Sequence, residues 1–391
     1  MKKTLAALAI LGAFAGTAAA ADVTLYGVID YGFNYQHVDG DAAGTDASDS
    51  FTMKSGQNSG SRFGLKGEED LGNGTKVGFV LENGFDADDG TFDTNGDRMF
   101  GREAQLYVQG NFGKLGFGRA GQFASALGSY GLLGQTSPFS AGWGSFTGQK
   151  FVQAAAHTRY DNMVTYQTPT FAGFQVSAQY SFGNSGKDAD KKTAWEEGKP
   201  TANRYYALAA TYKAQNLYIV GIVDSINYGS KETAAAGRET DPIDDSLTFT
   251  LGGNYDFGVA KVYAVGQYFD NALAVGQGSN IVADNTIGAG KYDFPNAAEG
   301  WDLALGVGVP CFGGTAKAHV GYLSAEDTKD SDYSLDRWNV SVGYDYSLSK
   351  RTSVYTAATY LRDSYEAPTA DKKADRDPSA VEFMVGMIHK F

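Results

Sequence analysis

The sequence predicts an all-β protein, a 16-stranded antiparallel transmembrane β-barrel with short periplasmic turns and long extracellular loops. Three observations lead to this fold class. Apolar and polar residues alternate with a period of two along many segments, short turns alternate with long polar stretches, and the chain ends in an alternating strand that closes on Phe391. Such a last strand is expected to pair with the first, at residues 23–27, which leaves the barrel without an open edge.

The N-terminus has the three regions of a secretory signal peptide. Met1–Lys3 is cationic, residues 5–15 are apolar, and residues 17–20 are small. This stretch is too short for a membrane anchor and predicts cleavage after Ala20. We therefore expect a signal peptide over residues 1–20 and a single β-barrel domain over residues 21–391.

Composition excludes several other classes. The chain has 51 Gly, 24 Tyr and 24 Phe but only 8 Pro, and its mean hydropathy is −0.30. After the signal peptide no apolar run approaches the ~18 residues of a spanning helix, whereas transmembrane strands give a weak signal of this kind. The net charge of −13 argues against a nucleic-acid partner, which would require a basic surface.

The positions of predicted turns and loops indicate the number of strands. Short turns containing Gly, Asn or Ser are expected at 71–74, 111–113, 170–173, 214–216, 256–258, 311–314 and 347–350. Longer polar segments lie near 39–57, 87–99, 123–157, 185–202, 229–245, 271–299, 327–335 and 365–379. Seven turns and eight loops make fifteen connections and hence sixteen strands, an even number as in bacterial outer-membrane barrels.

Alternation within the strands assigns their two faces. Leu25, Ile29 and Phe33 share one parity, while Asp30 and Asn34 share the other. The same separation recurs in later strands, so one face is expected to contact lipid and the other the aqueous lumen.

Acidic residues crowd two of the predicted outer loops. Asp39, Asp41, Asp46 and Asp49 lie in the first, and the next contains five more aspartates between residues 86 and 97. Two interpretations remain open: the loops are simply solvated, or they bind divalent cations that bridge lipopolysaccharide phosphates.

Five motifs together carry a family resemblance. They lie at residues 23–30 (VTLYGVID), 61–74 (SRFGLKGEEDLGNG), 112–119 (FGKLGFGR), 159–166 (RYDNMVTY) and 386–391 (GMIHKF). In this order the chain resembles the general diffusion porins of Gram-negative outer membranes, in the branch typical of β-proteobacteria.

The resemblance implies a function, a location and partners. It implies a homotrimer in the cell outer membrane, each barrel forming a water-filled channel for passive diffusion of ions and small hydrophilic solutes, without a cofactor. Lipopolysaccharide, outer-membrane lipid and the barrel-assembly machinery are the implied partners, and Phe391 is the implied assembly signal. The third loop, roughly Phe123–His157, is expected to fold into the lumen opposite a ladder of basic side chains.

The alternation of residues along each strand indicates which of these basic side chains face the lumen. Arg62 and Lys66 lie opposite in parity to Phe63 and Leu65, and Arg159 lies opposite to the outward residues of its strand. These three side chains are therefore expected in the lumen.

Arg119 is a separate case. It shares parity with the outward Leu115 and Phe117, so its inward placement requires a bulge or twist at Gly118. Asp30, Glu68 and Glu82 are the acids that could also face the lumen.

The third loop contains no Asp or Glu between Gly121 and Thr158, whereas Lys150 is basic. Charges at the narrowest point govern selectivity more than distant loops do, so we expect a preference for anions despite the negative net charge.

The loop also contains Tyr130, Phe139, Trp143 and Phe146. These aromatic residues either line a stacking track in a substrate-specific channel for a sugar or organic acid, the alternative function, or pack the loop against the wall. An enzyme is not expected, because none of the four histidines has the spacing of a catalytic triad or a metal site.

Overall fold

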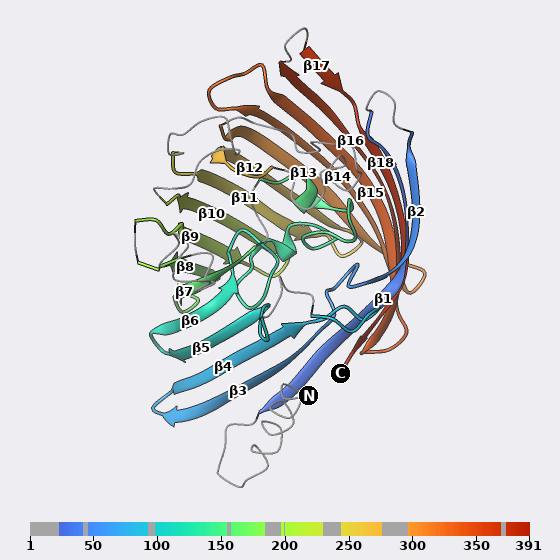
Figure 1. Ribbon diagram of the computed structural model, residues 1–391. Helices are drawn as coiled ribbons and strands as arrows, with labels where there is room; N and C mark the ends of the chain where they lie inside the picture. Colours follow the sequence, from blue (N-terminus) through green and yellow to red (C-terminus); the bar gives the residue numbers. More distant parts are fainter. Residues whose placement is uncertain are drawn as a thin grey trace, which may run out of the picture.

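The computed structural model describes residues 23–41, 46–92, 98–154, 158–183, 197–198, 200–229, 244–275, 296–368 and 373–391. These residues form one antiparallel sheet that closes on itself (Figure 1). The predicted signal peptide at 1–20 lies outside the described residues, as do most of the predicted loops near 185–202 and 229–245.

The strands follow one another around the barrel in chain order. They are β1 (Thr24–Asp39), β2 (Ser48–Ser55), β3 (Arg62–Gly72), β4 (Thr75–Gly84), β5 (Glu103–Gly110), β6 (Gly113–Gly121), β7 (Arg159–Gln167), β8 (Phe174–Ser181), β9 (Arg204–Lys213), β10 (Leu217–Asn227), β11 (Leu247–Asp256), β12 (Lys261–Ala272), β13 (Ala298–Cys311), β14 (Gly314–Asp327), β15 (Ser334–Ser347), β16 (Thr352–Pro368), β17 (Lys373–Arg376) and β18 (Ser379–Lys390). Two short 3-10 helices, η1 (Leu133–Gln135) and η2 (Gln149–Phe151), lie between β6 and β7.

The eighteen strands make sixteen spans. Strands β2 and β3 both pair with β1 and are parts of one span, interrupted at residues 56–61. Strands β17 and β18 both pair with β16 and likewise form one span. The predicted 16-stranded antiparallel barrel is thus confirmed. No helix in the described ranges is long and apolar enough to cross a membrane.

The seven short turns fall where the sequence placed them. For example, β3 and β4 are joined through Asn73 and Gly74, whose φ angles are 52° and 73°. Asn and Gly are the residues that most readily adopt such left-handed backbone. Each turn leads the chain back along its neighbour, so every connection at this end of the barrel is short.

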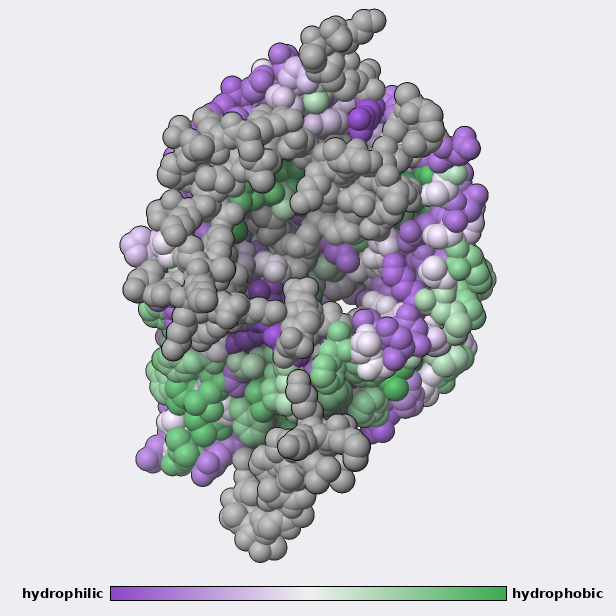
Figure 2. Space-filling model, in the orientation of Figure 1, coloured by the Kyte–Doolittle hydropathy of each residue, from purple (hydrophilic) through white to green (hydrophobic). Residues whose placement is uncertain are grey.

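The two faces of the wall also match the alternation. Along β18, Val381, Phe383 and Val385 are 39–50% exposed on the outer surface, whereas Glu382 and Met384 are fully buried on the inner side. Figure 2 shows hydrophobic residues gathered in a band over the outside of the barrel, with hydrophilic residues above and below it. This distribution suits a wall with lipid outside and polar groups within.

Closure depends on the pairing of the last strand with the first. Residues 28–39 of β1 pair with residues 379–390 of β18, and Gly27 and Phe391 exchange two backbone hydrogen bonds of 3.1 Å. A Cβ atom at position 27 would lie 2.2 Å from Cζ of the Phe391 ring, so any larger residue there would displace this ring.

The register corrects one expectation. The sequence predicts that the terminal strand pairs with residues 23–27, but of these only Gly27 bonds to it, and the terminal strand pairs with residues 28–39 of β1. The reason is the stagger of a tilted barrel, in which successive strands are displaced along one another.

Candidate functional site

The chain between β6 and β7, residues 122–158, is called loop 3 here. It runs inside the ring of strands (Figure 1). Its first part packs against β9 and β10, where Phe123 and Leu133 share a buried cluster with Tyr205 and Val220. Its later part reaches β14 to β18. These contacts place loop 3 across the lumen.

A buried carboxylate of β18 holds the middle of loop 3. Glu382 is fully buried and accepts hydrogen bonds from the backbone N–H groups of Ser145 (2.8 Å) and Phe146 (3.0 Å) and from the Thr147 hydroxyl (3.3 Å). The Asn34 amide also donates to it at 2.8 Å. Hydrogen bonds to a carboxylate are stronger than bonds to a neutral acceptor, so this set of bonds should hold the loop firmly. We call it the Glu382 latch.

Neighbouring strands bind the following part of the loop. The Asn339 amide donates to the carbonyl oxygens of Phe146 and Gly148, both at 3.0 Å. Arg337 donates to the carbonyl oxygen of Phe151 at 3.1 Å and forms a fully buried, two-bond ion pair with Asp363, each bond 2.7 Å. The loop backbone thus finds its partners in wall side chains, as buried polar groups require.

The aromatic residues of loop 3 pack it against the wall. Tyr130, Phe139, Trp143 and Phe146 are each at most 3% exposed. Trp143 meets Tyr355 of β16 with ring centroids 5.4 Å apart. The structure therefore favours packing over a stacking track for these four residues, because none of them offers an open face to the lumen.

A second segment folds inward beside loop 3. Between β2 and β3, the backbone N–H groups of Asn58 and Ser59 donate to Asp30 of β1, both at 2.7 Å. Gly144 of loop 3 donates to the Gln57 carbonyl oxygen at 2.7 Å. Asp30 does face inward as expected, but it is fully buried and engaged in holding this segment.

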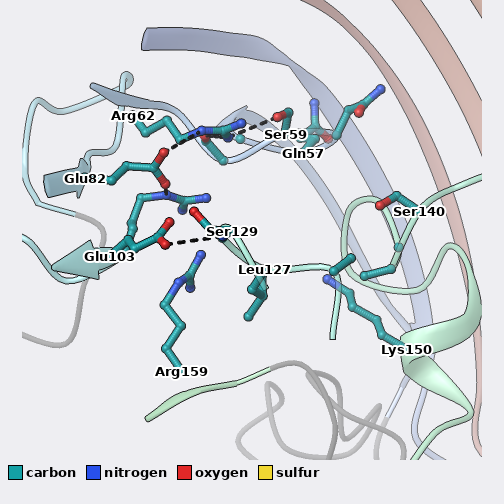
Figure 3. Close-up of a pocket in the computed structure, with 18 of the residues that line it drawn as sticks. Gln57, Ser59, Arg62, Glu82, Glu103, Leu127, Ser129, Ser140, Lys150 and Arg159 are labelled. Atoms are coloured by element: carbon teal, nitrogen blue, oxygen red, sulfur yellow. Dashed lines mark hydrogen bonds and ion pairs between the residues drawn. The ribbon is translucent and has the colours of Figure 1, made fainter. Parts of the chain in front are cut away.

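Beside loop 3 lies a cavity of about 670 Å³. Five basic side chains and two carboxylates belong to its lining: Arg62, Lys66, Arg102, Lys150, Arg159, Glu82 and Glu103. Figure 3 shows Arg62, Glu82, Glu103 and Arg159 on one side, with Ser140 and Lys150 of loop 3 across from them. We call this cavity the constriction cavity; cations outnumber anions in it.

Both carboxylates of the constriction cavity are engaged. Glu82 lies between Arg102 (2.9 Å) and Arg62 (3.5 Å) and accepts the Tyr26 hydroxyl at 3.1 Å. Glu103 accepts the backbone N–H of Ser129 at 3.4 Å (Figure 3). A solute in the cavity therefore meets one carboxylate that two arginines balance, Glu82, and one that is hydrogen-bonded to the loop 3 backbone, Glu103.

Lys150 is the loop 3 cation of this cavity. Its burial between loop and wall lowers the pKa of its ammonium to about 8, because the charged form is poorly solvated there. The Glu382 carboxylate opposes this shift and nearby Lys54 adds to it. The charge of Lys150 is therefore present at neutral pH and lost in mildly alkaline solution.

Arg119 does not line the constriction cavity. The expected irregularity is present: the register of β6 and β7 shifts between Gly118 and Ala120, and Gly118 has a φ of 126°. The guanidinium turns to Asp161 of β7 at 2.6 Å, where Arg98 also binds at 2.7 Å. The alternation of residues along the strand does not predict this ion pair, which holds Arg119 against the wall.

Glu68 also lies apart from the constriction cavity. It forms an ion pair of 2.7 Å with Lys76 and accepts the Gln109 amide at 2.7 Å, close to the short-turn end of the barrel. Of the three predicted lumen acids, Glu82 alone belongs to the lining of the constriction cavity.

Three side chains that make these contacts are not indicated by the sequence alone. Arg102 directly precedes β5, so no strand parity indicated its direction, and Glu103 and Glu382 look like ordinary inward residues of their strands. The only signal that the sequence offers for Glu103 and Glu382 is that each is an acid on the inward face of its strand. Their partners in loop 3 are distant in the sequence and cannot be inferred from it.

Comparisons with known proteins agree with this architecture. Residues 4–365 match the family of Gram-negative porins. The chain is 36% identical over 381 residues to an outer membrane porin protein of Bordetella pertussis, covering 93% of this chain and 95% of that one. It is 30% identical over 369 residues to the outer membrane porin protein 32 of Delftia acidovorans, covering 93% and 90%. A solved anion-selective porin from Comamonas acidovorans matches with a TM-score of 0.67 and 25% identity, covering 95% of this chain and all of the other.

The Glu382 latch can be tested by Glu382→Gln. The amide presents N–H donors where the carboxylate accepts from two backbone N–H groups, which we expect to cost about 1.5–3 kcal/mol. Hydrogen exchange at Ser145 and Phe146 should accelerate by roughly 10- to 100-fold. Glu69→Gln, an exposed acid of β3, should leave this exchange unchanged, and equal protection in Glu382→Gln would disprove the latch.

Proposed function

The chain belongs to the Gram-negative porin family, and on this basis we propose that its constriction favours small anions over cations. As a member it is an outer-membrane channel and not an enzyme. The proposal concerns the sign of selectivity. The observation that carries it is the lining of the constriction cavity, in which five basic side chains face two carboxylates.

The electrostatics of the constriction support this sign. Two unit charges 4 Å apart interact by about 1 kcal/mol in water and about 4 kcal/mol at an effective dielectric constant of 20. Glu82 is matched by two arginines, and loop 3 contributes Lys150 without any acid of its own. An entering anion therefore meets an excess of positive charge at close range, where the negative loops outside are screened by salt.

One relative agrees with the proposal. The solved porin from Comamonas acidovorans with 25% identity is described as anion-selective. Permeation by passive diffusion fits the polar lining of the constriction cavity. The stacking track that would favour a substrate-specific channel has no support in Tyr130, Phe139, Trp143 and Phe146, because all four are buried.

We further infer that the barrel works as a homotrimer. Its wall is uneven: β5 and β8 have eight residues each, whereas β13 to β16 have 14 to 17. Eight tilted residues fall short of the 9–11 that span a bilayer, so a neighbouring barrel is a better cover for this side than lipid. Lipopolysaccharide, lipid and the barrel-assembly machinery remain the partners that the family relationship implies.

Selectivity can be measured as the reversal potential of the purified protein in a planar bilayer under a salt gradient. We expect anion preference in the wild type. Lys66→Gln and Arg159→Gln should each reduce the anion-to-cation permeability ratio by up to about fivefold, the equivalent of about 1 kcal/mol, and Glu82→Gln should raise it. Arg351→Gln removes the same charge from an exposed turn and serves as the control. Cation preference in the wild type would refute the proposal.

The contribution of Lys150 should appear as a pH dependence. Since its pKa is about 8, the ammonium is charged below this pH, and anion preference should fall as the pH rises from 7 to 9. Lys150→Arg should keep the high preference throughout, and Lys150→Gln should show the low preference at every pH. A wild-type midpoint absent from this range would contradict the assignment.

The homotrimer predicts a defined mass in mild detergent. Light scattering corrected for detergent should give the protein mass of three chains, and heating should release monomers. A single-chain mass before heating would exclude the trimer.

A further inference from the structure

We propose that the periplasmic half of the lumen holds a second anion-binding site, next to Lys114 and separate from the constriction. This site rests on the open channel proposed above but not on the sign of its selectivity. Its chemistry is that of a small phosphate or carboxylate anion.

A cavity of about 410 Å³ lies at the short-turn end of β4 to β8. Six polar side chains line it: Lys76, Gln109, Lys114, Gln167, Thr168 and Gln175. All of these except Thr168 belong to strands, and their side chains are on the inward-facing side of those strands. No lining residue is shared with the constriction cavity. The cavity therefore opens to the lumen as a site of its own.

Most of these side chains already have partners. The Lys76 ammonium and the Gln109 amide both bind Glu68 at 2.7 Å, and the Gln175 amide donates to the Thr168 carbonyl oxygen at 2.9 Å. In the described part of the chain, no side-chain hydrogen bond or ion pair involves the Lys114 ammonium or the Gln167 amide. These two groups are the donors left for a ligand.

The position of Lys114 is fixed by aromatic rings instead of a carboxylate. Its ammonium lies 4.0 Å from the ring centroid of Tyr107 and 5.1 Å from that of Tyr130 in loop 3. A ring face attracts a cation but leaves its N–H donors unused. The same arrangement recurs on the inner wall, where Lys213 and Lys261 lie over Tyr218 and Tyr263.

The charge balance makes an anion the fitting ligand. Lys114 is half-buried, and a partly buried cation is costly unless a partner compensates it. The carboxylates that act on it electrostatically, Glu68 and Glu103, are bound to Lys76 and Ser129. An anion in the cavity would accept from Lys114 and Gln167 together, and the volume of about 410 Å³ suits a small solute.

The experiment uses the purified full-length protein in detergent and inorganic phosphate as the probe. Binding is measured as broadening of the phosphorus resonance of phosphate by the large protein–detergent particle. We expect Lys114→Gln to reduce the excess line width at least fivefold and Lys114→Arg to retain most of it. Lys390→Gln, which removes an exposed lysine near the same end of the barrel, should retain it fully.

Two further arms locate the site and identify its ligand. Lys213→Gln, which removes an inner-wall lysine that lies over a tyrosine in the same way but outside both cavities, should leave the broadening unchanged, and succinate should be tested as a competitor. Displacement of phosphate by succinate supports a site for both kinds of anion, and lack of displacement supports a phosphate site. Unchanged broadening in Lys114→Gln, or its loss in Lys213→Gln, would overturn the proposal.

Folding of the variants and the sign of selectivity are checked separately. Lys114→Gln should run as a folded barrel on an unheated gel and keep the sign of the wild-type reversal potential. A wild type with cation preference that still broadens phosphate through Lys114 would refute the proposed selectivity and leave this site standing.

Discussion

The position of loop 3 inside the barrel depends on hydrogen bonds from wall side chains to its backbone. The Glu382 carboxylate is the centre of this set, since it accepts from two successive N–H groups of the loop, and Asn339 and Arg337 bind the carbonyl oxygens that follow. A loop without regular structure would otherwise bury polar backbone groups at considerable cost. The barrel supplies the partners, so the loop can stay inside it.

The same arrangement shapes the electrostatics of the lumen. Asp30 and Glu382 face inward, yet both are fully buried beneath the segments that they hold, and Glu82 is matched by two arginines. These three inward carboxylates are therefore occupied by contacts within the protein, although the chain as a whole is acidic. Lys150 and Lys66 line the cavity in addition to the paired arginines, and this is why charge counts over the whole chain are a poor guide to permeation.

Much of the fold could be predicted because its determinants are local. A period of two fixes the face of each residue, and Asn73-Gly74 fixes a turn, so strand number and inward residues such as Asp30 followed from the sequence. The course of loop 3 did not, because Ser145 and Glu382 are 237 residues apart. The alternation of residues also could not show that Asp161 binds Arg119 or that Arg102 reaches Glu82. It could not show that residues 56–61 fold inward either. Each of these features depends on contacts between segments that are distant in the sequence.

The bonds between Gly27 and Phe391 also determine when this protein can finish folding. They join nearly the first described residue to the last, so the closing contact has the largest sequence separation in the barrel. Contacts between distant residues form slowly because a long loop must be closed first. Until β18 has paired with β1, two strand edges with unpaired N–H and C=O groups persist, and such edges promote association with other chains. A chain whose sheet has not yet closed is therefore an aggregation-prone intermediate, and the pairing of β18 with β1 is the step that removes it.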